Sequence, residues 1–173
     1  MRKFLLVLTL VLSTLTVFGQ SIKISNEGKE FIKKYESCVL TAYWDTNGYS
    51  IGYGHHSKEV HKTMKITQHQ AEQLFIKDIK RTEAYVEAMI KDLPYTHNFS
   101  QGFIDGFVSF TYNVGPGGAR NSIFYQRLKK CRVVNGKMNE EDLAYAMAGL
   151  KISKVHTTHH KQRRIGEYQM MIS

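Results

Sequence analysis

Two carboxylates stand nine positions apart in the stretch ESCVLTAYWDTNGYSIGYGHH, which begins at Glu36. Glu36 closes a segment with helical patterning, whereas Asp45 lies in a glycine-punctuated segment with strand-like residues. Acid-catalysed cleavage of a glycosidic bond needs two carboxyls on opposite sides of the linkage. One is protonated to assist the leaving oxygen, and the other is ionised to act on water or on the developing cation. The pattern therefore predicts that Glu36 and Asp45 are an acid/base pair facing one cleft.

The elements on either side of this pair follow from local patterning. Ser25 or Asn26 is a suitable N-cap for an amphipathic helix that ends near Cys38. Over residues 39–64 the chain becomes rich in aromatic, β-branched and glycine residues, and DTNG is typical of a turn between strands. We therefore expect Glu36 at the end of a helix and Asp45 in a small sheet of about three strands.

Helices dominate the rest of the chain. Thr67 and Gln70 have capping-box spacing and predict a long helix towards Ile90 that joins the sheet to the remainder. Residues 101–113 are nearly apolar on all sides, which predicts a buried central helix. NVGPGGARNS is expected to form a loop, and further helices are expected over 122–130, 140–148 and 160–171. The predicted fold class is α+β, with a small antiparallel sheet lobe and a larger helical lobe joined by the long helix.

The N-terminus has the composition of an export signal. Arg2 and Lys3 precede an apolar run from Phe4 to Phe18, and the small residue Gly19 follows. This run is shorter than the roughly 20 residues that a membrane span needs. The sequence predicts a signal peptide over 1–19 and one mature domain over 20–173, exported to the periplasm or the extracellular space without stable membrane anchoring. A retained signal anchor is the alternative.

The chain is strongly basic. Its formal net charge of +9 falls by two, to +7, when Arg2 and Lys3 are removed. Such a charge favours a polyanionic partner because long-range attraction raises encounter rates, although it can also serve only solubility. After export, nucleic acid is a poor candidate, whereas cell-wall carbohydrate carrying peptide carboxylates is available. We therefore expect peptidoglycan, and no nucleic acid, as the partner.

Cysteines and histidines give no strong indication of a metal site. Cys38 and Cys131 allow either one disulfide or two buried thiols. His156, His159 and His160 have helical spacing, but no acidic or cysteine partner accompanies them. We expect no metal and no other cofactor.

The mature chain resembles the phage-type lysozymes, the endolysins and muramidases of glycoside hydrolase family 24. Three blocks in register carry the resemblance. The first is E-x8-D followed by G-x-S-I-G-Y-G-H, from Glu36. The second is Q-x3-D-[AG]-x2-S-F-x-[FY]-N-x-G from Gln101, and the third is R-R-x2-E from Arg163. The resemblance implies a lysozyme-like α+β fold.

The same resemblance implies roles for individual residues. Glu36 would be the general acid, Asp45 the second carboxylate, and Ser50 the hydroxyl that helps hold the attacking water. The family usually has Thr at the position of Ser50, and one more residue between the turn glycine and that hydroxyl. Arg163 corresponds to the arginine that pairs with the catalytic glutamate; an ordinary charge on a helix surface is the alternative.

Five side chains are candidates for contact with the sugar. Tyrosine rings can stack on a glycan or bond to it, but they can equally pack in the core. For the histidine of this set, a hydrogen bond that supports the active-site strand is the preferred interpretation. The candidates are Tyr49, Tyr53, His55, Asn113 and Arg163.

Together these observations predict an exported, monomeric muramidase. Its reaction would be hydrolysis of the β-1,4 bond between N-acetylmuramic acid and N-acetylglucosamine. A lytic transglycosylase uses one carboxyl and forms an anhydro product without water, so the presence of both Asp45 and Ser50 argues against it. A non-catalytic, cationic wall-binding protein on the same scaffold is a further alternative, because a fold does not guarantee its chemistry.

Overall fold

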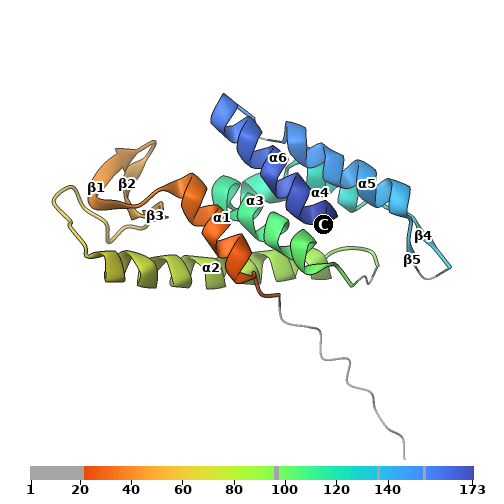
Figure 1. Cartoon of the computed structure of the whole chain (residues 1–173), viewed down its shortest axis with the longest axis horizontal. Coiled ribbons are helices and arrows are strands. Elements are labelled where there is room, and N and C mark those ends of the chain that lie inside the picture. Colours follow the sequence, from red (N-terminus) through yellow and green to blue (C-terminus); the bar gives the residue numbers. More distant parts are fainter. Residues whose placement is uncertain (1–21, 96–97, 136, 154) are drawn as a thin grey trace, which may run out of the picture.

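A small sheet lobe and a larger helical lobe are joined by the long helix α2, which runs beneath both in Figure 1. The computed structural model describes residues 22–95, 98–135, 137–153 and 155–173, so the expected signal peptide lies outside the described residues. No helix within these ranges is long and apolar enough to cross a membrane. The architecture confirms the α+β prediction. In chain order the elements are α1 (Asn26–Glu36), β1 (Val39–Asp45), β2 (Gly48–Gly52), β3 (His55–His56), α2 (Gln68–Lys91), α3 (Gln101–Arg120), α4 (Ile123–Leu128), β4 (Val133–Val134), β5 (Lys137–Met138), α5 (Glu140–Ala148), a 3₁₀ helix (Gly149–Ile152) and α6 (Thr158–Ile172).

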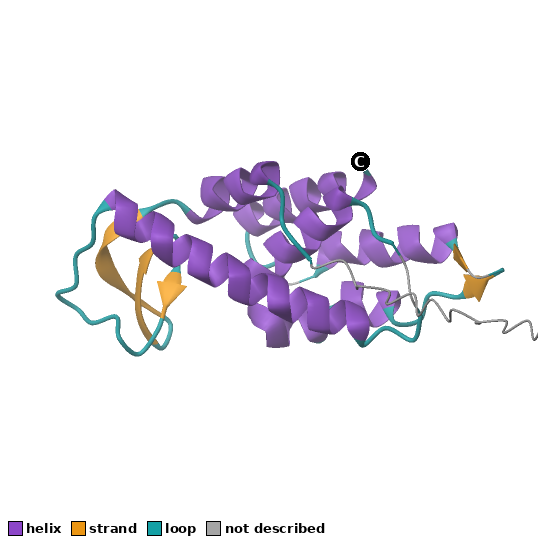
Figure 2. Ribbon diagram, turned by 90° about the horizontal axis from the view of Figure 1, so that it is seen from below, coloured by secondary structure: helices purple, strands orange, loops and turns teal. Residues whose placement is uncertain are grey.

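The sheet lobe is a three-stranded antiparallel sheet in the order β1-β2-β3. It lies at one end of α2 in both views (Figures 1 and 2). The start of α2 is fixed by the predicted capping box: Thr67 accepts from the backbone N–H of Gln70, and the Gln70 side chain accepts from the backbone N–H of Thr67. The sheet is thus attached to a helix whose start is set by interactions between residues close in sequence.

Helix α1 is anchored at both ends. Ser25 caps its start by accepting from the backbone N–H of Gly28, and the backbone N–H of Ser25 donates to Asp105 of α3 at 2.8 Å. The helix ends at Glu36, because the next residue, Ser37, has a φ of 57° and leaves the helical conformation. Glu36 therefore projects from a fixed position facing the sheet lobe.

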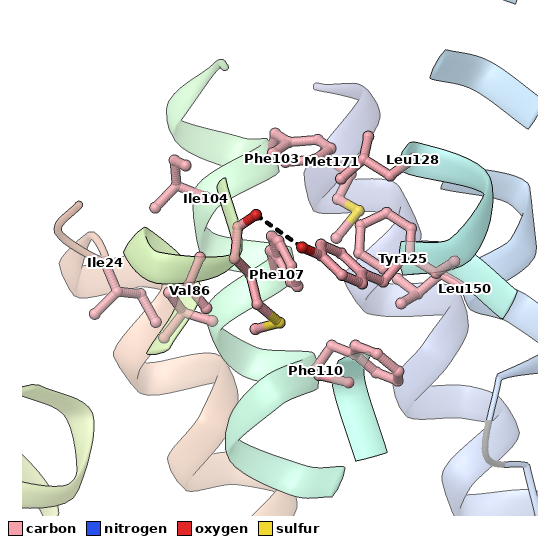
Figure 3. Close-up of a cluster of buried hydrophobic side chains, with 14 of the residues drawn as sticks. Ile24, Val86, Phe103, Ile104, Phe107, Phe110, Tyr125, Leu128, Leu150 and Met171 are labelled. Atoms are coloured by element: carbon pink, nitrogen blue, oxygen red, sulfur yellow. Dashed lines mark hydrogen bonds between the residues drawn. The ribbon is translucent and has the colours of Figure 1, made fainter. Parts of the chain in front are cut away.

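Helix α3 is the buried centre of the helical lobe, as predicted. Every residue from Phe103 to Thr111 is buried. Figure 3 shows the aromatic side chains of this helix packed against α4 and α6, and the hydroxyl of Tyr125 donates to the backbone carbonyl of Met89 at 2.9 Å. This core joins α2, α3, α4 and α6 through one buried hydrophobic cluster.

The predicted loop NVGPGGARNS is wrong in part. Helix α3 continues to Arg120, with a single break at Gly115, whose φ is 71° and ψ is 164°. Glycine adopts this positive φ at little cost, and Pro116 then starts a new helical turn where no N–H donor is required. Glycine and proline here redirect a helix rather than end it.

A short hairpin in the helical lobe was not predicted. Strand β4 pairs with β5 in antiparallel register, Val133 opposite Met138. The Asn-Gly dipeptide between the strands is a typical hairpin signal that the sequence analysis overlooked. Figure 2 places the hairpin far from the sheet lobe, so it takes no part in the candidate site.

The two cysteines are free thiols. Cys38 lies near the start of α2, where its thiol donates to Gln68 at 3.6 Å. Cys131 is buried in the helical lobe. The structure therefore contains two free thiols rather than a disulfide, but the prediction that both are buried holds for Cys131 alone, because Cys38 is partly exposed.

Close packing of α3 against α6 depends on glycines, which gives a first testable prediction. A Cβ atom on Gly106 would lie 2.7 Å from the backbone oxygen of Glu167 and 2.7 Å from Cγ of Met171. Gly106→Ala should therefore lower the free energy of unfolding by about 1–3 kcal/mol, measured by urea denaturation.

The matched control is Gly117→Ala, because a Cβ at that helical position meets no atom within 4 Å. This variant should be neutral or more stable by up to about 1 kcal/mol. Equal losses of unfolding free energy in Gly106→Ala and Gly117→Ala would contradict the packing argument.

Candidate active site

Glu36 is held by Arg163, 127 positions later in the chain. The Nη1 atom of Arg163 donates to Oε1 of Glu36 at 2.5 Å, and the side chains are 1% and 19% exposed, respectively. Arg163 also donates through Nε to Glu167 at 3.0 Å and through Nη2 to the backbone oxygen of Ser109 at 3.2 Å. The expected pairing is present, and the alternative of a surface charge is wrong, because the guanidinium is buried and bonded to these three groups.

A buried carboxylate, Glu167, holds Arg163 in place. The Glu167 carboxylate is fully buried and accepts from Arg163, Arg164 and the Ser109 hydroxyl. Burial raises the pKa of Glu167, and the two guanidinium groups act in the opposite direction. The R-R-x2-E block is therefore an anchor: α6 presents one guanidinium to Glu36 and uses the other to neutralise Glu167.

The glycine between Tyr53 and His55 lies next to Glu36. Gly54 has a φ of 81°, and a Cβ there would lie 3.4 Å from Oε2 of Glu36. A side chain at this position would be strained by the positive φ, whereas its Cβ would make only an ordinary contact with the Glu36 oxygen. The second oxygen of Glu36 thus faces the sheet lobe across a bare stretch of backbone.

The strand register places the other two predicted catalytic residues on one face of the sheet. Tyr43 lies opposite Ser50, and Ser50 lies opposite His56. Because successive side chains of a strand alternate between faces, Asp45 shares the face of Tyr43. Asp45 is exposed at the end of β1, and its Oδ1 accepts from the Thr46 hydroxyl at 3.1 Å. The site therefore combines a partly buried, ion-paired carboxyl with an exposed one.

Tyr43 was not among the predicted site residues, although it lies opposite Ser50 and on the same face as Asp45. Burial, followed by the negative charges of Asp45 and Glu36, raises the pKa of Tyr43, while hydrogen bonding with Ser50 lowers it. The phenol thus lies within electrostatic range of both carboxylates. Alternation was the signal available from sequence, since Tyr43 precedes Asp45 by two residues within a predicted strand.

Three of the predicted sugar contacts do not reach this face. Tyr49 lies opposite Trp44 on the other face, with ring centroids 5.2 Å apart. Tyr53 is 8% exposed and donates to Glu72 at 2.7 Å. His55 is 7% exposed, and its Nδ1 is 2.7 Å from a carboxylate oxygen of Asp78 on α2. Tyr53 and His55 therefore connect the sheet to α2, which is the structural role preferred for His55.

Asn113 lies beside the break in α3. Its side-chain oxygen accepts from Arg164, and it borders a hollow of about 260 Å³ that also touches His156 and His160. The rings of these two histidines have centroids 6.0 Å apart. Within the described ranges, no three His, Cys, Asp or Glu side chains are grouped so as to hold a metal ion. Of the predicted sugar contacts, Arg163 pairs directly with Glu36, whereas Asn113 is bonded to Arg164 at the border of this hollow.

The fold and the site define a lysozyme-like α+β protein. Residues 33–162 match the protein-family model for phage lysozyme. The chain therefore belongs to the phage lysozyme family.

Individual relatives agree with this assignment. The endolysin of Bacillus phage PZA is 35% identical over 114 residues, which are 64% of this chain and 42% of that protein. The chain thus spans about two fifths of the length of that relative. The endolysin of Acyrthosiphon pisum secondary endosymbiont phage 1 is 34% identical over 107 residues, covering 61% of this chain and 68% of that protein.

Solved structures show the same fold. The endolysin from Escherichia coli O157:H7 phage FAHEc1 has a TM-score of 0.66 and 30% identity, covering 87% of this chain and 94% of that one. The muramidase domain of SpmX from Asticaccaulis excentricus has a TM-score of 0.71, with coverage of 87% and 98%. At 20% identity, the second comparison concerns the fold alone.

Proposed function

We propose that this protein is an exported muramidase, a glycoside hydrolase that cleaves the β-1,4 bond between N-acetylmuramic acid and N-acetylglucosamine in peptidoglycan. The observation that carries the proposal is the pairing of Glu36 with the buried Arg163 beside a sheet whose Tyr43 face also carries Asp45 and Ser50, in a chain of the phage lysozyme family. The endolysin relatives and the net positive charge support a cell-wall substrate. The protein would act as a monomer, and the reaction would need no metal or organic cofactor.

Glu36 and Asp45 have different roles in the proposed reaction. Glu36 gives its proton to the leaving oxygen, and the Arg163 guanidinium stabilises the carboxylate that remains. Asp45, which is exposed to solvent, acts as the second carboxylate and orients the attacking water together with the Ser50 hydroxyl. In an inverting reaction of this kind, the two carboxyls stand about 6.5–9.5 Å apart so that a water fits between the sugar and the second carboxylate.

Mass spectrometry of soluble fragments tests the reaction directly. The protein, processed to residues 20–173, is incubated with purified peptidoglycan. A hydrolase releases muropeptides with reducing ends. Fragments lighter by one water would identify a lytic transglycosylase instead, and binding without fragments would identify a wall-binding protein.

The role of Asp45 gives a second prediction. Asp45→Asn should lower kcat by about 100-fold or more, because the amide cannot act as a base towards water. Release of reducing ends from purified peptidoglycan measures the rate. Glu59→Gln is the matched control, since it removes another exposed negative charge from the sheet lobe and should leave the rate unchanged. An Asp45→Asn variant at wild-type speed would show that another group handles the water.

A further inference from the structure

The Ser50 hydroxyl lies in a row of three polar side chains that crosses the whole sheet. Tyr43 on β1, Ser50 on β2 and His56 on β3 are direct cross-strand neighbours. Ser50 is 1% exposed, and its Oγ is 3.2 Å from Nδ1 of His56. The buried hydroxyl therefore has an imidazole on one side and a phenol on the other.

The turn glycine fixes the imidazole in this row. A Cβ on Gly48 would lie 2.7 Å from Cε1 and 3.2 Å from Nε2 of His56, so the ring lies directly against the bare backbone. Any side chain at position 48 would push the ring away. His56 is exposed overall, but one side of its ring lies against Gly48 and its Nδ1 contacts Ser50. This is the same shortened segment, Gly48 to Ser50, that departs from the usual family spacing.

The proposed reaction depends on which hydrogen bond the Ser50 hydroxyl donates and which it accepts. A serine hydroxyl has one proton to donate and two lone pairs that accept. A water that attacks carbon must keep a lone pair directed at that carbon, so it has to donate its protons to neighbouring groups. Ser50 can accept such a proton reliably only if its own proton is committed elsewhere. An unprotonated ring nitrogen 3.2 Å away is a suitable acceptor.

We propose that His56 is a positioning residue for the attacking water. Its unprotonated Nδ1 accepts the proton of Ser50, which leaves the Ser50 lone pairs free to accept a hydrogen bond from the water. This inference rests on the proposed hydrolase function and adds to it a residue outside the predicted site. His56 acts only through Ser50, so its removal should slow the chemical step and leave substrate binding unchanged.

Two substitutions separate the hydrogen bond from the packing. His56→Phe keeps a ring over Gly48 but has no acceptor, whereas His56→Asn places an amide oxygen close to the position of Nδ1. We expect His56→Phe to lower kcat about tenfold with KM unchanged, and His56→Asn to recover most of the rate. The control His61→Phe, at an exposed histidine of the same lobe, should retain full activity.

A double-mutant cycle with Ser50→Ala tests whether the two residues act together. If His56 works through Ser50, adding His56→Phe to Ser50→Ala should cause no further loss of kcat. Independent, multiplicative losses would overturn the inference, as would a His56→Phe variant with the wild-type kcat. Non-additivity between Ser50→Ala and Tyr43→Phe, without any with His56→Phe, would assign the acceptor role to Tyr43 and also overturn it.

Folding and function failures remain distinguishable in this design. Circular dichroism and urea unfolding show whether each variant is folded, and His56→Leu replaces His56→Phe in the same cycle if the larger ring prevents folding. Wild-type protein that releases no reducing ends would refute the hydrolase function itself. Active wild type with a fully active, folded His56→Leu variant would refute only the role of His56.

Discussion

Glu36→Gln should abolish turnover of peptidoglycan, with a loss in kcat of about 10³-fold or more. Glutamine cannot deliver a proton to the leaving oxygen, but its side-chain oxygen can still accept from Arg163, so the fold should persist. Release of reducing ends measures the rate, and co-sedimentation with purified peptidoglycan measures binding. The variant should bind the wall like the wild type.

The control for this experiment lies on the same helix. Glu30→Gln changes an exposed carboxylate of α1 whose nearest cation, Lys33, is also paired with Glu72. It should retain full activity. Substantial activity in Glu36→Gln would exclude Glu36 as the general acid, while loss in both variants would indicate damage to α1 rather than to the chemistry.

Glu167→Gln should be the most destabilising single change of charge in the helical lobe. The carboxylate is fully buried and neutralises two buried guanidinium groups, Arg163 and Arg164. Removing one member of a buried ionic cluster leaves uncompensated charge inside the protein, at a cost of about 3–5 kcal/mol. Urea denaturation measures the loss, and activity should fall as well, because Arg163 loses one of the groups that direct it at Glu36.

A surface ion pair provides the comparison for Glu167. Glu87 pairs with Lys91 one turn away on α2, with Lys91 largely exposed. Glu87→Gln should change the free energy of unfolding by no more than about 0.5 kcal/mol. If the two variants were equally stable, the stability of the helical lobe would not depend on the charge of Glu167.

Several parts of this molecule were predictable because the interactions that form them are local. The cap of α1 at Ser25 and the capping box of Thr67 with Gln70 each join residues three positions apart. The apolar run of α3 similarly indicated its burial. The Glu36 to His55 block placed the candidate carboxylates at the end of a helix and in a strand, which is where the structure has them.

Other features were missed where neighbouring residues give an ambiguous signal. Glycine and proline at positions 115 and 116 are typical of a loop, yet packing keeps the chain helical on both sides of one residue with positive φ. Tyr53 has the residue type of a sugar contact, but its hydroxyl is bonded to Glu72 within the sheet–helix junction. Residue type alone cannot distinguish a groove from a core.

The sequence by itself determined the family and the α+β class and indicated two candidate carboxylates, because the motifs and helix caps lie in short stretches of the chain. The tertiary structure decided which groups surround them. Arg163 reaches Glu36 across 127 positions because α6 packs on α3, and Tyr43, Ser50 and His56 form a row only because of the register of three strands. Such contacts depend on the relative placement of elements, which local patterning does not specify.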